Sequence, residues 1–402
     1  MLYLNLKNNN RLKNIEFKLE RKKYLKKIKR AVVKIGTSSL TSGNGNPDIK
    51  KMGKFAAEVA KSADTGVEII IVTSGAIAAG LQFLGISSRP KDISKLQAAA
   101  AVGQVELMGK YSSLFCSLGK KIGQILLTRE DMTRRIQYLN IKNTIENLLK
   151  LKVIPVINEN DSVAVEEIKF GDNDRLAALV SSLTQADLLI MLTDTGGLYD
   201  RNPADLKSPD GARLISFVEK ITPAIEQLAG GKGSEYSLGG MLSKIKAAKI
   251  CSFLQIPSVI ADSSTEDVIS KIINFEKIGT FFAPAPGRKV KSLKRWIAFG
   301  IVSKGSIIID SGAVNAVISG GKSILPVGVV EVQGSFNKGD TLNVYSTDGM
   351  LIAKGISNFS DRDVVKVMGK KENKILEQHG SSLCFEIIHR DSLVVFDENN
   401  YE

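Results

Sequence analysis

The sequence is poor in the residue types on which many enzyme sites depend. Cys116, Cys251 and Cys384 are the only cysteines among 402 residues and form no CxxC pair, which argues against a disulfide scaffold or a zinc site and fits a reducing cytosol. The only histidines, His379 and His389, lie in the last 25 residues. Chemistry in the first 280 residues must therefore proceed without an imidazole base, which excludes Ser-His-Asp, Cys-His and HExxH sites there.

The chain also lacks a long apolar run. Its most apolar stretch, 67–86, contains Glu68, Gln82 and three glycines, whereas a membrane-spanning helix needs about 18 apolar residues or more. The composition, 43% hydrophobic and 24% charged, is typical of a globular protein and not of a disordered one. Because domains typically hold about 100–200 residues, we expect two or three domains, a cytoplasmic location and no membrane attachment.

Positive charge is concentrated at the N-terminus. The formal net charge is +13, but residues 1–30 contain eleven lysines and arginines and two acidic residues, so the rest of the chain carries only +4. Residues 1–30 lack the apolar run of a secretory signal and are rich in lysine, not in arginine and serine. We interpret them as a solvated basic arm. A mis-assigned start, a targeting segment and a nucleic-acid contact are the alternatives.

Short β-branched runs alternate with helical patterns through residues 31–282. This alternation predicts an α/β fold, with a parallel sheet covered by helices on both faces. We expect strands at 31–35, 68–73, 121–127, 153–158, 188–192, 256–260 and 279–282. We expect helices at 48–64, with Asp48 as the cap, and at 76–84, 94–118, 138–150 and 176–183.

A proline-bearing segment, 283–289, precedes a change of pattern. Short strands are predicted at 305–310, 328–332, 341–345 and 382–388, with one helix at 311–319, which indicates a small β-rich, barrel-like domain. Gly321-Lys322-Ser323 lacks the upstream glycine of a Walker phosphate loop, and we interpret it as a turn. The predicted organisation is an arm (1–30), a first domain (31–282), a linker (283–294), a second domain (295–391) and a C-terminal tail (392–402).

Four polar stretches directly follow predicted strands, at 36–39, 73–75, 158–161 and 193–197. In open α/β sheets, ligands bind beyond the carboxyl ends of the strands. We therefore expect these stretches to form the rim of an active site. The turns at 74–75 and 193–194 are candidates for ligand contacts, although plain turns would have the same composition.

Two lysines occupy positions that suit an anion. Lys34 lies inside an apolar strand, where it is either exposed on an edge or reaches an anion at the strand end. The adjacent 36–39 turn offers backbone and hydroxyl donors, which favours a phosphate. Lys244 lies in the first turns of a helix opened by Gly239 and Gly240, where the helix dipole disfavours a cation unless an anion binds there. A pair of glycines before a helix is, however, common.

Residues 158–161 and 170–174 are the densest polar clusters. Helix capping would explain one aspartate or asparagine in each, but not seven acidic and amide side chains at one rim. Such a cluster suits recognition of an amino-acid ammonium group, orientation of lysines, or Mg²⁺ held partly by water.

These segments together resemble the glutamate 5-kinases, a family with the amino-acid kinase fold. The resemblance covers residues 31–391. Its matching segments are 32–37, 71–80, 100–104, 126–129, 154–161, 170–174, 192–199 and 239–244. The second domain, with Lys294-Arg-Trp296 before Gly305 and Gly328 after Pro326, is similar to a PUA domain.

The resemblance implies a three-layer α/β/α amino-acid kinase domain that uses ATP and Mg²⁺ to phosphorylate the γ-carboxylate of L-glutamate, the first step of proline synthesis. A glutamate side chain is already ionised at neutral pH, which explains why no histidine base is needed. By matching positions, Lys34 and Lys244 are the catalytic lysines and Asp174 orients them. Substrate binding is assigned to Ser74, Asp161, Asn173, Asn158 and Asp172. ATP binding is assigned to Lys34, Thr193, Asp194, Leu238, Gly239, Gly240, Met241, Leu242, Ser243 and Lys244, and no protein ligand is assigned to the metal.

The sequence departs from the family pattern at Ser237-Leu238, where Gly-Thr is usual, and at Ser243, where Thr is usual. Leu238 therefore retains only its backbone for a phosphate contact. The family further implies a homo-oligomer, dimeric or tetrameric, with proline as a feedback inhibitor. Two rivals remain: a sister kinase acting on N-acetylglutamate, which should lack the paired polar clusters, and an RNA-binding protein acting through the PUA-like domain. The low net charge of residues 31–402 and the single tryptophan argue against an RNA-binding protein.

Overall fold

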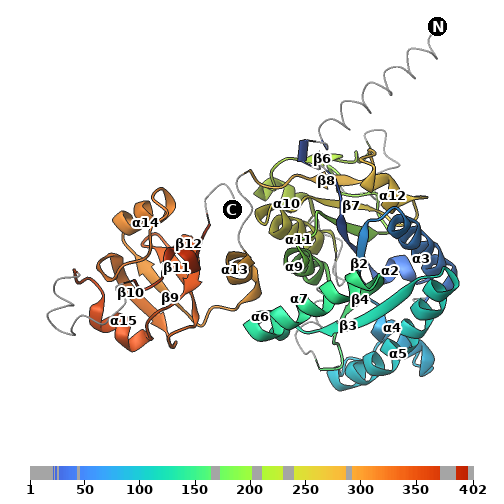
Figure 1. Ribbon diagram of the computed structural model, residues 1–402, viewed down its shortest axis with the longest axis horizontal. Helices are drawn as coiled ribbons and strands as arrows, with labels where there is room; N and C mark the ends of the chain where they lie inside the picture. The colour runs from blue at the N-terminus through green and yellow to red at the C-terminus, as the bar shows by residue number, and fades with distance from the viewer. Residues whose placement is uncertain are drawn as a thin grey trace, which may run out of the picture. The chain divides into compact units, whose positions relative to one another are not determined.

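The chain forms two compact units, Met1–Arg288 and Lys289–Glu402. The computed structural model describes residues 21, 23–24, 27–42, 46–163, 173–201, 211–229, 240–286, 292–371 and 386–396. Each unit contains its own sheet (Figure 1). Within the described residues, no helix combines the length and the apolar character needed to cross a membrane.

The first unit is built on an eight-stranded sheet in the order β3-β4-β2-β1-β5-β7-β8-β6. All neighbouring strands run parallel except β7 and β8. The strands predicted from the apolar runs are confirmed; the two-residue β6 was not predicted, because it is too short to show a pattern. The strand bounds are β1 (Arg30–Ile35), β2 (Glu68–Val72), β3 (Lys121–Leu127), β4 (Val153–Glu159), β5 (Leu188–Thr193), β6 (Phe217–Val218), β7 (Ser258–Asp262) and β8 (Thr280–Phe282).

Helices cover both faces of this sheet, as predicted. The five predicted helices are confirmed as α3 (Ile49–Asp64), α4 (Ala76–Phe83), α5 (Ile93–Ser117), α7 (Arg135–Lys150) and α9 (Asn173–Thr184). Asp48 caps α3 by accepting the N–H groups of Lys50 and Lys51. The helix expected after Gly240 is α11 (Met241–Phe253), and the remaining ones are α2 (Thr37–Leu40), α6 (Arg129–Thr133), α10 (Pro223–Ala229) and α12 (Val268–Ile273).

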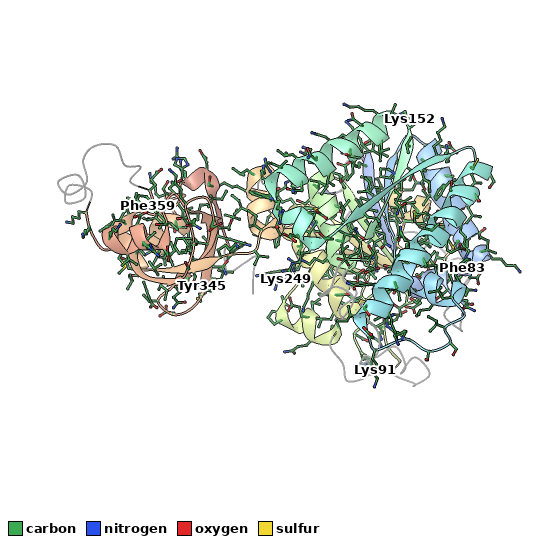
Figure 2. All side chains as sticks on the ribbon, turned by 90° about the horizontal axis from the view of Figure 1, so that it is seen from below. Phe83, Lys91, Lys152, Lys249, Tyr345 and Phe359 are labelled. Atoms are coloured by element: carbon green, nitrogen blue, oxygen red, sulfur yellow. The ribbon has the colours of Figure 1, made fainter. Side chains whose placement is uncertain are left out.

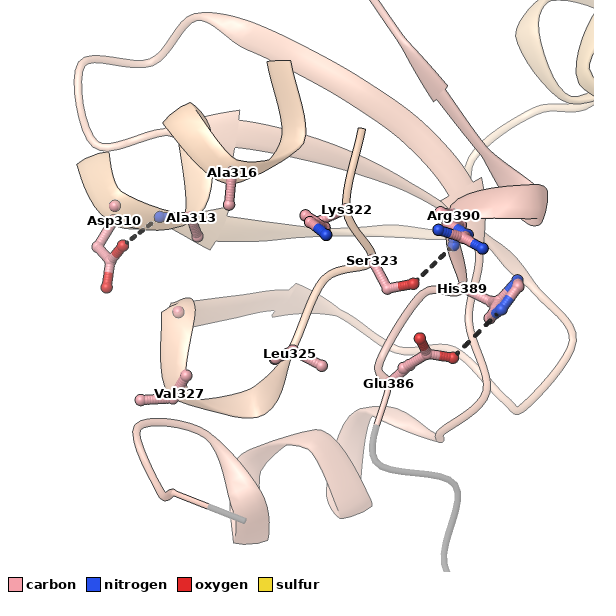
Figure 3. A pocket seen from close by; sticks show the side chains of 12 residues that line it. Asp310, Ala313, Ala316, Lys322, Ser323, Leu325, Val327, Glu386, His389 and Arg390 are labelled. Atoms are coloured by element: carbon pink, nitrogen blue, oxygen red, sulfur yellow. Dashed lines mark hydrogen bonds and ion pairs between the residues drawn. The ribbon is translucent and has the colours of Figure 1, made fainter. Parts of the chain in front are cut away.

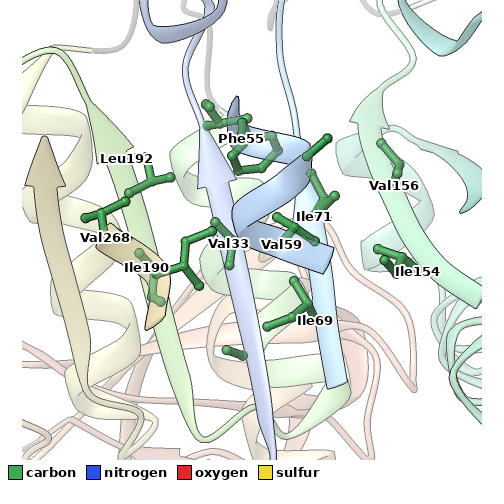
Figure 4. Packing of buried hydrophobic residues seen from close by; sticks show 14 of the residues in the cluster. Val33, Phe55, Val59, Ile69, Ile71, Ile154, Val156, Ile190, Leu192 and Val268 are labelled. Carbon is green, nitrogen blue, oxygen red and sulfur yellow. The ribbon is translucent and has the colours of Figure 1, made fainter. Parts of the chain in front are cut away.

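One face of the sheet packs against α3, α5 and α12. In Figure 4, Phe55 of α3 and Val268 of α12 lie over Val33, Ile71 and Leu192 of the central strands, all of them buried. Helices α7, α9 and α11 contact the strands on the other side. The alternation of side chains along each strand thus divides the apolar runs between two cores, which makes β1, β2 and β5 the rigid centre of the unit.

The second unit is a five-stranded sheet in the order β10-β9-β11-β12-β13. Three of its predicted strands and the predicted helix are confirmed, but β12, β13 and the helix α15 were not predicted. Of the strand predicted at 382–388, only 386–388 are described, and there Ile388 forms an isolated bridge with Ile324. The bounds are α13 (Ser292–Arg295), η2 (Trp296–Gly300), β9 (Gly305–Ile309), α14 (Ser311–Ile318), η3 (Pro326–Gly328), β10 (Val329–Gly334), β11 (Thr341–Ser346), β12 (Leu351–Ile356), α15 (Asp361–Val367), η4 (Arg390–Ser392) and β13 (Leu393–Val395). The sheet therefore continues past residue 391, where the sequence placed the beginning of a tail.

The Gly321-Lys322-Ser323 segment is a loop, in agreement with the predicted turn. It lines a cavity of about 580 Å³ in the second unit, together with Asp310, Leu325 and Arg390 (Figure 3). The hydroxyl of Ser323 accepts the backbone N–H of Arg390 at 2.9 Å. This loop therefore helps to shape the second unit.

The predicted solvated arm is wrong at its C-terminal end. The Arg21 guanidinium donates to the carbonyls of Glu276 at 2.7 Å and Ile278 at 2.9 Å, and it lies 5.2 Å from the ring centre of Phe281. The Tyr24 ring is 6.3 Å from the same ring, and Ile28 is buried. Burial lowers the pKa of Arg21 to about 9. Charge counting placed this segment in solvent because it ignored the aromatic and aliphatic surface between the lysines. Residues 1–20 of the arm lie outside the described residues.

Candidate active site

The polar stretches meet at one edge of the first sheet. Strands β1, β2, β4 and β5 are parallel neighbours, so their carboxyl ends lie together. The turns after β1 and β2 are in contact: a Cβ on Gly75, whose φ is +107°, would lie 3.7 Å from Cγ2 of Thr37. This left-handed backbone favours glycine and lets the Ser74-Gly75 turn lead directly into α4.

Two lysines converge on one carboxylate at this edge. Lys34 Nζ lies 2.7 Å from Asp174 Oδ1, and Lys244 Nζ lies 3.3 Å from Asp174 Oδ2. Lysines such as Lys91 and Lys152 lie at the surface (Figure 2), whereas Lys34 is 4% exposed, Lys244 5% and Asp174 0%. The three groups come from β1, α9 and α11, which are separated by up to 210 residues in the chain. The alternative that Lys34 is exposed on an edge strand is therefore wrong.

The two ammonium groups and the carboxylate shift one another's pKa values. Burial works to raise the pKa of Asp174, but the ammonium groups of Lys34 and Lys244 outweigh it and hold that pKa below its ordinary value. Burial lowers the pKa of Lys244, and the neighbouring charge of Lys34 adds to this effect. Two buried ammonium groups held side by side by one carboxylate are suited to bind the oxygens of an anion such as a phosphate.

Helix α11 presents its N-terminus to the same centre. It begins at Met241 after Gly240, and no side chain caps its first N–H groups. Ser243, in the first turn, donates its hydroxyl to Asp174 Oδ2 at 2.5 Å. Uncapped N–H groups next to buried ammonium groups are the donor set that phosphate oxygens require. Ser243 was assigned to ATP; its bond to Asp174 could not be read from the sequence.

A chain of buried amides lies beside this centre. Asn173 Nδ2 donates to Thr73 O at 2.7 Å, Ser74 Oγ at 2.8 Å and Asn158 Oδ1 at 3.1 Å. Asn158 Nδ2 donates in turn to Gln104 Oε1 at 2.8 Å. Three predicted substrate-binding residues, Ser74, Asn158 and Asn173, are thereby brought together from the turn after β2, from β4 and from α9.

Comparison with known proteins identifies the family of this chain. The model of the Amino acid kinase family matches residues 29–262, and that of the PUA domain matches residues 305–378. The chain is 42% identical to a protein named Glutamate 5-kinase from Syntrophotalea carbinolica over 375 residues, 93% of this chain and 99% of that one. It is 45% identical to a Glutamate 5-kinase from Caldanaerobacter subterraneus over 368 residues, 92% of this chain and 98% of that one. The chain belongs to the glutamate 5-kinase family.

The other residues assigned from the glutamate 5-kinase pattern lie at the ends of β5, β4 and α11 or outside the described residues. Thr193 ends β5 and donates its hydroxyl to Asp194 Oδ1 at 3.1 Å. The charge of Asp194 also acts on Lys244, so the end of β5 lies close to the two lysines. Asp161 is half-buried in a turn just after β4. Met241 and Leu242 form the first turn of α11, and Asp172, Leu238 and Gly239 lie outside the described residues.

Two residues that support the candidate site, Gln104 and Tyr111, were not assigned a role from the sequence. Gln104 lay in a matching segment without a role, although it ends the amide chain. Tyr111 of α5 is fully buried, and its hydroxyl is 2.9 Å from Oγ1 of Thr73, so it supports the turn that carries Ser74. Burial raises the pKa of Tyr111 above its ordinary value, which keeps the phenol neutral. A buried tyrosine one helix away offers no local sequence signal for this contact.

Proposed function

We propose that this protein transfers the terminal phosphoryl group of ATP to the γ-carboxylate of L-glutamate, giving L-glutamyl 5-phosphate and ADP, the first step of proline biosynthesis. The single observation that carries the proposal is the convergence of two buried ammonium groups, those of Lys34 and Lys244, on the carboxylate of Asp174. Membership of the glutamate 5-kinase family supports it.

The reaction needs positioning and charge stabilisation and no base. The attacking carboxylate is ionised at neutral pH, and phosphoryl transfer spreads negative charge over the oxygens of the moving group. Lys34 at the end of β1 and Lys244 at the start of α11 approach from two elements. They stabilise that charge on the phosphoryl group and on the ADP oxygen that leaves. Asp174 holds both ammonium groups in place.

The nucleotide is proposed to bind at the ends of β5 and α11. Thr193 and Asp194 contact it from one side, and the backbone of 238–244 receives its phosphates, with Ser243 and Lys244 at the centre. Mg²⁺ bound to the phosphate oxygens would neutralise further charge there. Among the described residues, no three acidic, histidine or cysteine side chains form a metal cluster.

Glutamate is proposed to bind opposite, on the amide chain. Ser74, Asn173 and Asp161 hold it, while Asn158 and Asp172 support them. Asp161 and Asp172 supply negative charge for the substrate ammonium group, and the rim around Lys34 receives its γ-carboxylate. We further propose, from the family resemblance, that the protein is a homo-oligomer, dimeric or tetrameric, and that proline inhibits it.

An ADP-release assay tests this function. With MgATP, the purified protein is given L-glutamate, N-acetyl-L-glutamate, L-aspartate or glutarate, and proline is added to the active reaction. We expect turnover to depend on L-glutamate and to fall when proline is added. Faster turnover of N-acetyl-L-glutamate would instead assign the protein to the sister kinases. If L-glutamate is turned over but proline does not inhibit the reaction, only the proposal that proline inhibits the protein is refuted.

A further inference from the structure

The amide chain beside the two lysines has a single possible direction. Thr73 contributes a backbone carbonyl, which can only accept, so the Asn173 atom 2.7 Å from it must be the nitrogen. Asn173 Nδ2 then requires an acceptor on Asn158, which turns the Asn158 nitrogen toward Gln104. Gln104 must therefore accept this hydrogen bond through its side-chain oxygen. One backbone carbonyl thus sets the orientation of three side-chain amides, which is the way amide orientations are assigned from a network.

The two ends of this chain have opposite hydrogen-bonding character. Gln104 Nε2 is left as a donor and Asn173 Oδ1 as an acceptor, and neither has a partner among the described residues. Gln104 is 8% exposed and Asn173 is 7% exposed, so bulk water does not satisfy these atoms. Buried, unpaired polar atoms are costly, and a fold keeps them where a ligand completes them.

Gln104 is also held firmly in place. The adjacent Gly103 packs against α4 so closely that a Cβ on it would lie 1.8 Å from the carbonyl of Ala76. A Cβ on Gly80 would likewise lie 1.8 Å from the carbonyl of Ala99. The backbones of α4 and α5 therefore touch directly, and α4 begins at the Ser74-Gly75 turn. Gln104 is a rigid part of the site, because its helix cannot move without moving this turn.

We propose that Gln104 is a further specificity-determining residue: its Nε2 donates to the α-carboxylate of the substrate, while Asn173 Oδ1 accepts from the α-ammonium group. This inference rests on the proposed function. A free amino acid carries one acceptor and one donor group on its α-carbon, which matches the free donor and the free acceptor of the amide chain. A substrate that lacks the α-carboxylate leaves the Gln104 donor unpaired, and an N-acylated one offers Asn173 a neutral amide where an ammonium group would bind more strongly.

The test uses Gln104→Glu, because a carboxylate still accepts from Asn158 but no longer donates. We expect KM for L-glutamate to rise at least tenfold while KM for ATP changes less than twofold. Gln82→Glu makes the same charge change on the exposed side of α4 and should leave both constants unchanged. If Gln104 only supported the fold, Gln104→Glu would keep its bond to Asn158 and KM for glutamate would not move; that result would overturn the proposal. Gln104→Met removes both the donor and the acceptor of Asn158. If it replaces a Gln104→Glu variant that fails to fold, the inhibition constants of the analogues below decide the matter, since loss of the Asn158 bond alone should weaken both analogues.

Substrate analogues identify the group that Gln104 contacts. Inhibition constants are measured for 4-aminobutyrate, which lacks the α-carboxylate, and for glutarate, which lacks the ammonium group. In the Gln104→Glu variant, the inhibition constant of glutarate should rise at least tenfold, and that of 4-aminobutyrate should rise less than twofold. The opposite pattern would refute the assignment to the carboxylate. If the unmodified protein shows no glutamate-dependent ADP release, the proposed function itself fails, and the inference fails with it. An active unmodified protein with an unchanged Gln104→Glu variant rejects only the inference.

Discussion

Replacing Lys244 by methionine separates the catalytic from the structural role of the buried charges. Methionine keeps most of the aliphatic stem and removes the ammonium group, which leaves Lys34 and Asp174 as a matched pair at 2.7 Å. Burial lowers the pKa of Lys244 below its ordinary value of 10.5. The folded state binds fewer protons there than the unfolded state only between the lowered folded pKa and 10.5; at lower pH, keeping the buried lysine charged subtracts from stability. We expect the melting temperature of Lys244→Met to be unchanged or higher.

The effect on catalysis should be large. A unit charge about 4 Å from another contributes about 4 kcal/mol at an effective dielectric constant of about 20. Lys244 is 5% exposed and lies 3.3 Å from Asp174, so solvent screens it little. Because about 1.4 kcal/mol corresponds to a factor of ten in rate, losing its stabilisation of the transferring phosphoryl group should lower kcat about a thousandfold.

Steady-state ADP release at saturating ATP and L-glutamate measures this change, with thermal unfolding of the same sample as the test of folding. Lys246→Met is the matched control, because Lys246 is exposed two residues further along α11 and should retain full activity. A folded Lys244→Met variant with an unchanged kcat would refute the role assigned to the ammonium group. A comparable loss in Lys246→Met would show that the effect comes from the helix and not from the site.

Three further perturbations test neighbouring parts of the structure. Asp174→Asn removes the carboxylate that both buried ammonium groups contact and should lower the free energy of unfolding at pH 7 by about 3–5 kcal/mol in urea titrations. Because the folded pKa of Asp174 is lowered, its stabilisation is present above its ordinary pKa of 3.8 and is lost as the pH falls through the folded value, so the variant should also show a flatter acid dependence. Asp161→Ala should raise KM for glutamate in steady-state kinetics, and an effect confined to ATP would contradict its assignment. Gly80→Ala places a Cβ 1.8 Å from the carbonyl of Ala99 and should destabilise the fold by about 1–3 kcal/mol in thermal or urea unfolding; an unchanged stability would contradict the close helix contact.

Local patterns in the sequence were sufficient to predict most strands and helices of the first unit. The apolar runs that became β1, β2, β4 and β5 are long enough to be recognised, and an alternating order of strands and helices leaves few topologies for a parallel sheet. The direction of β8 was not predictable in this way, because an apolar run reads the same in a parallel and in an antiparallel strand. In the second unit, β13 has only three residues. It was assigned to a tail because so short a run shows no recognisable strand pattern.

The amino-acid sequence by itself determined which side chains were available to the site: two lysines at strand and helix ends, two clusters of acids and amides, and no histidine nearby. Each of these is a local property of composition and spacing. Only the tertiary structure decided which atoms meet. It placed Ser243 on Asp174, directed the amide chain from Thr73 to Gln104, and packed Arg21 against Phe281. These contacts join segments tens to hundreds of residues apart, and their geometry follows from how helices pack on the sheet, which no local period encodes.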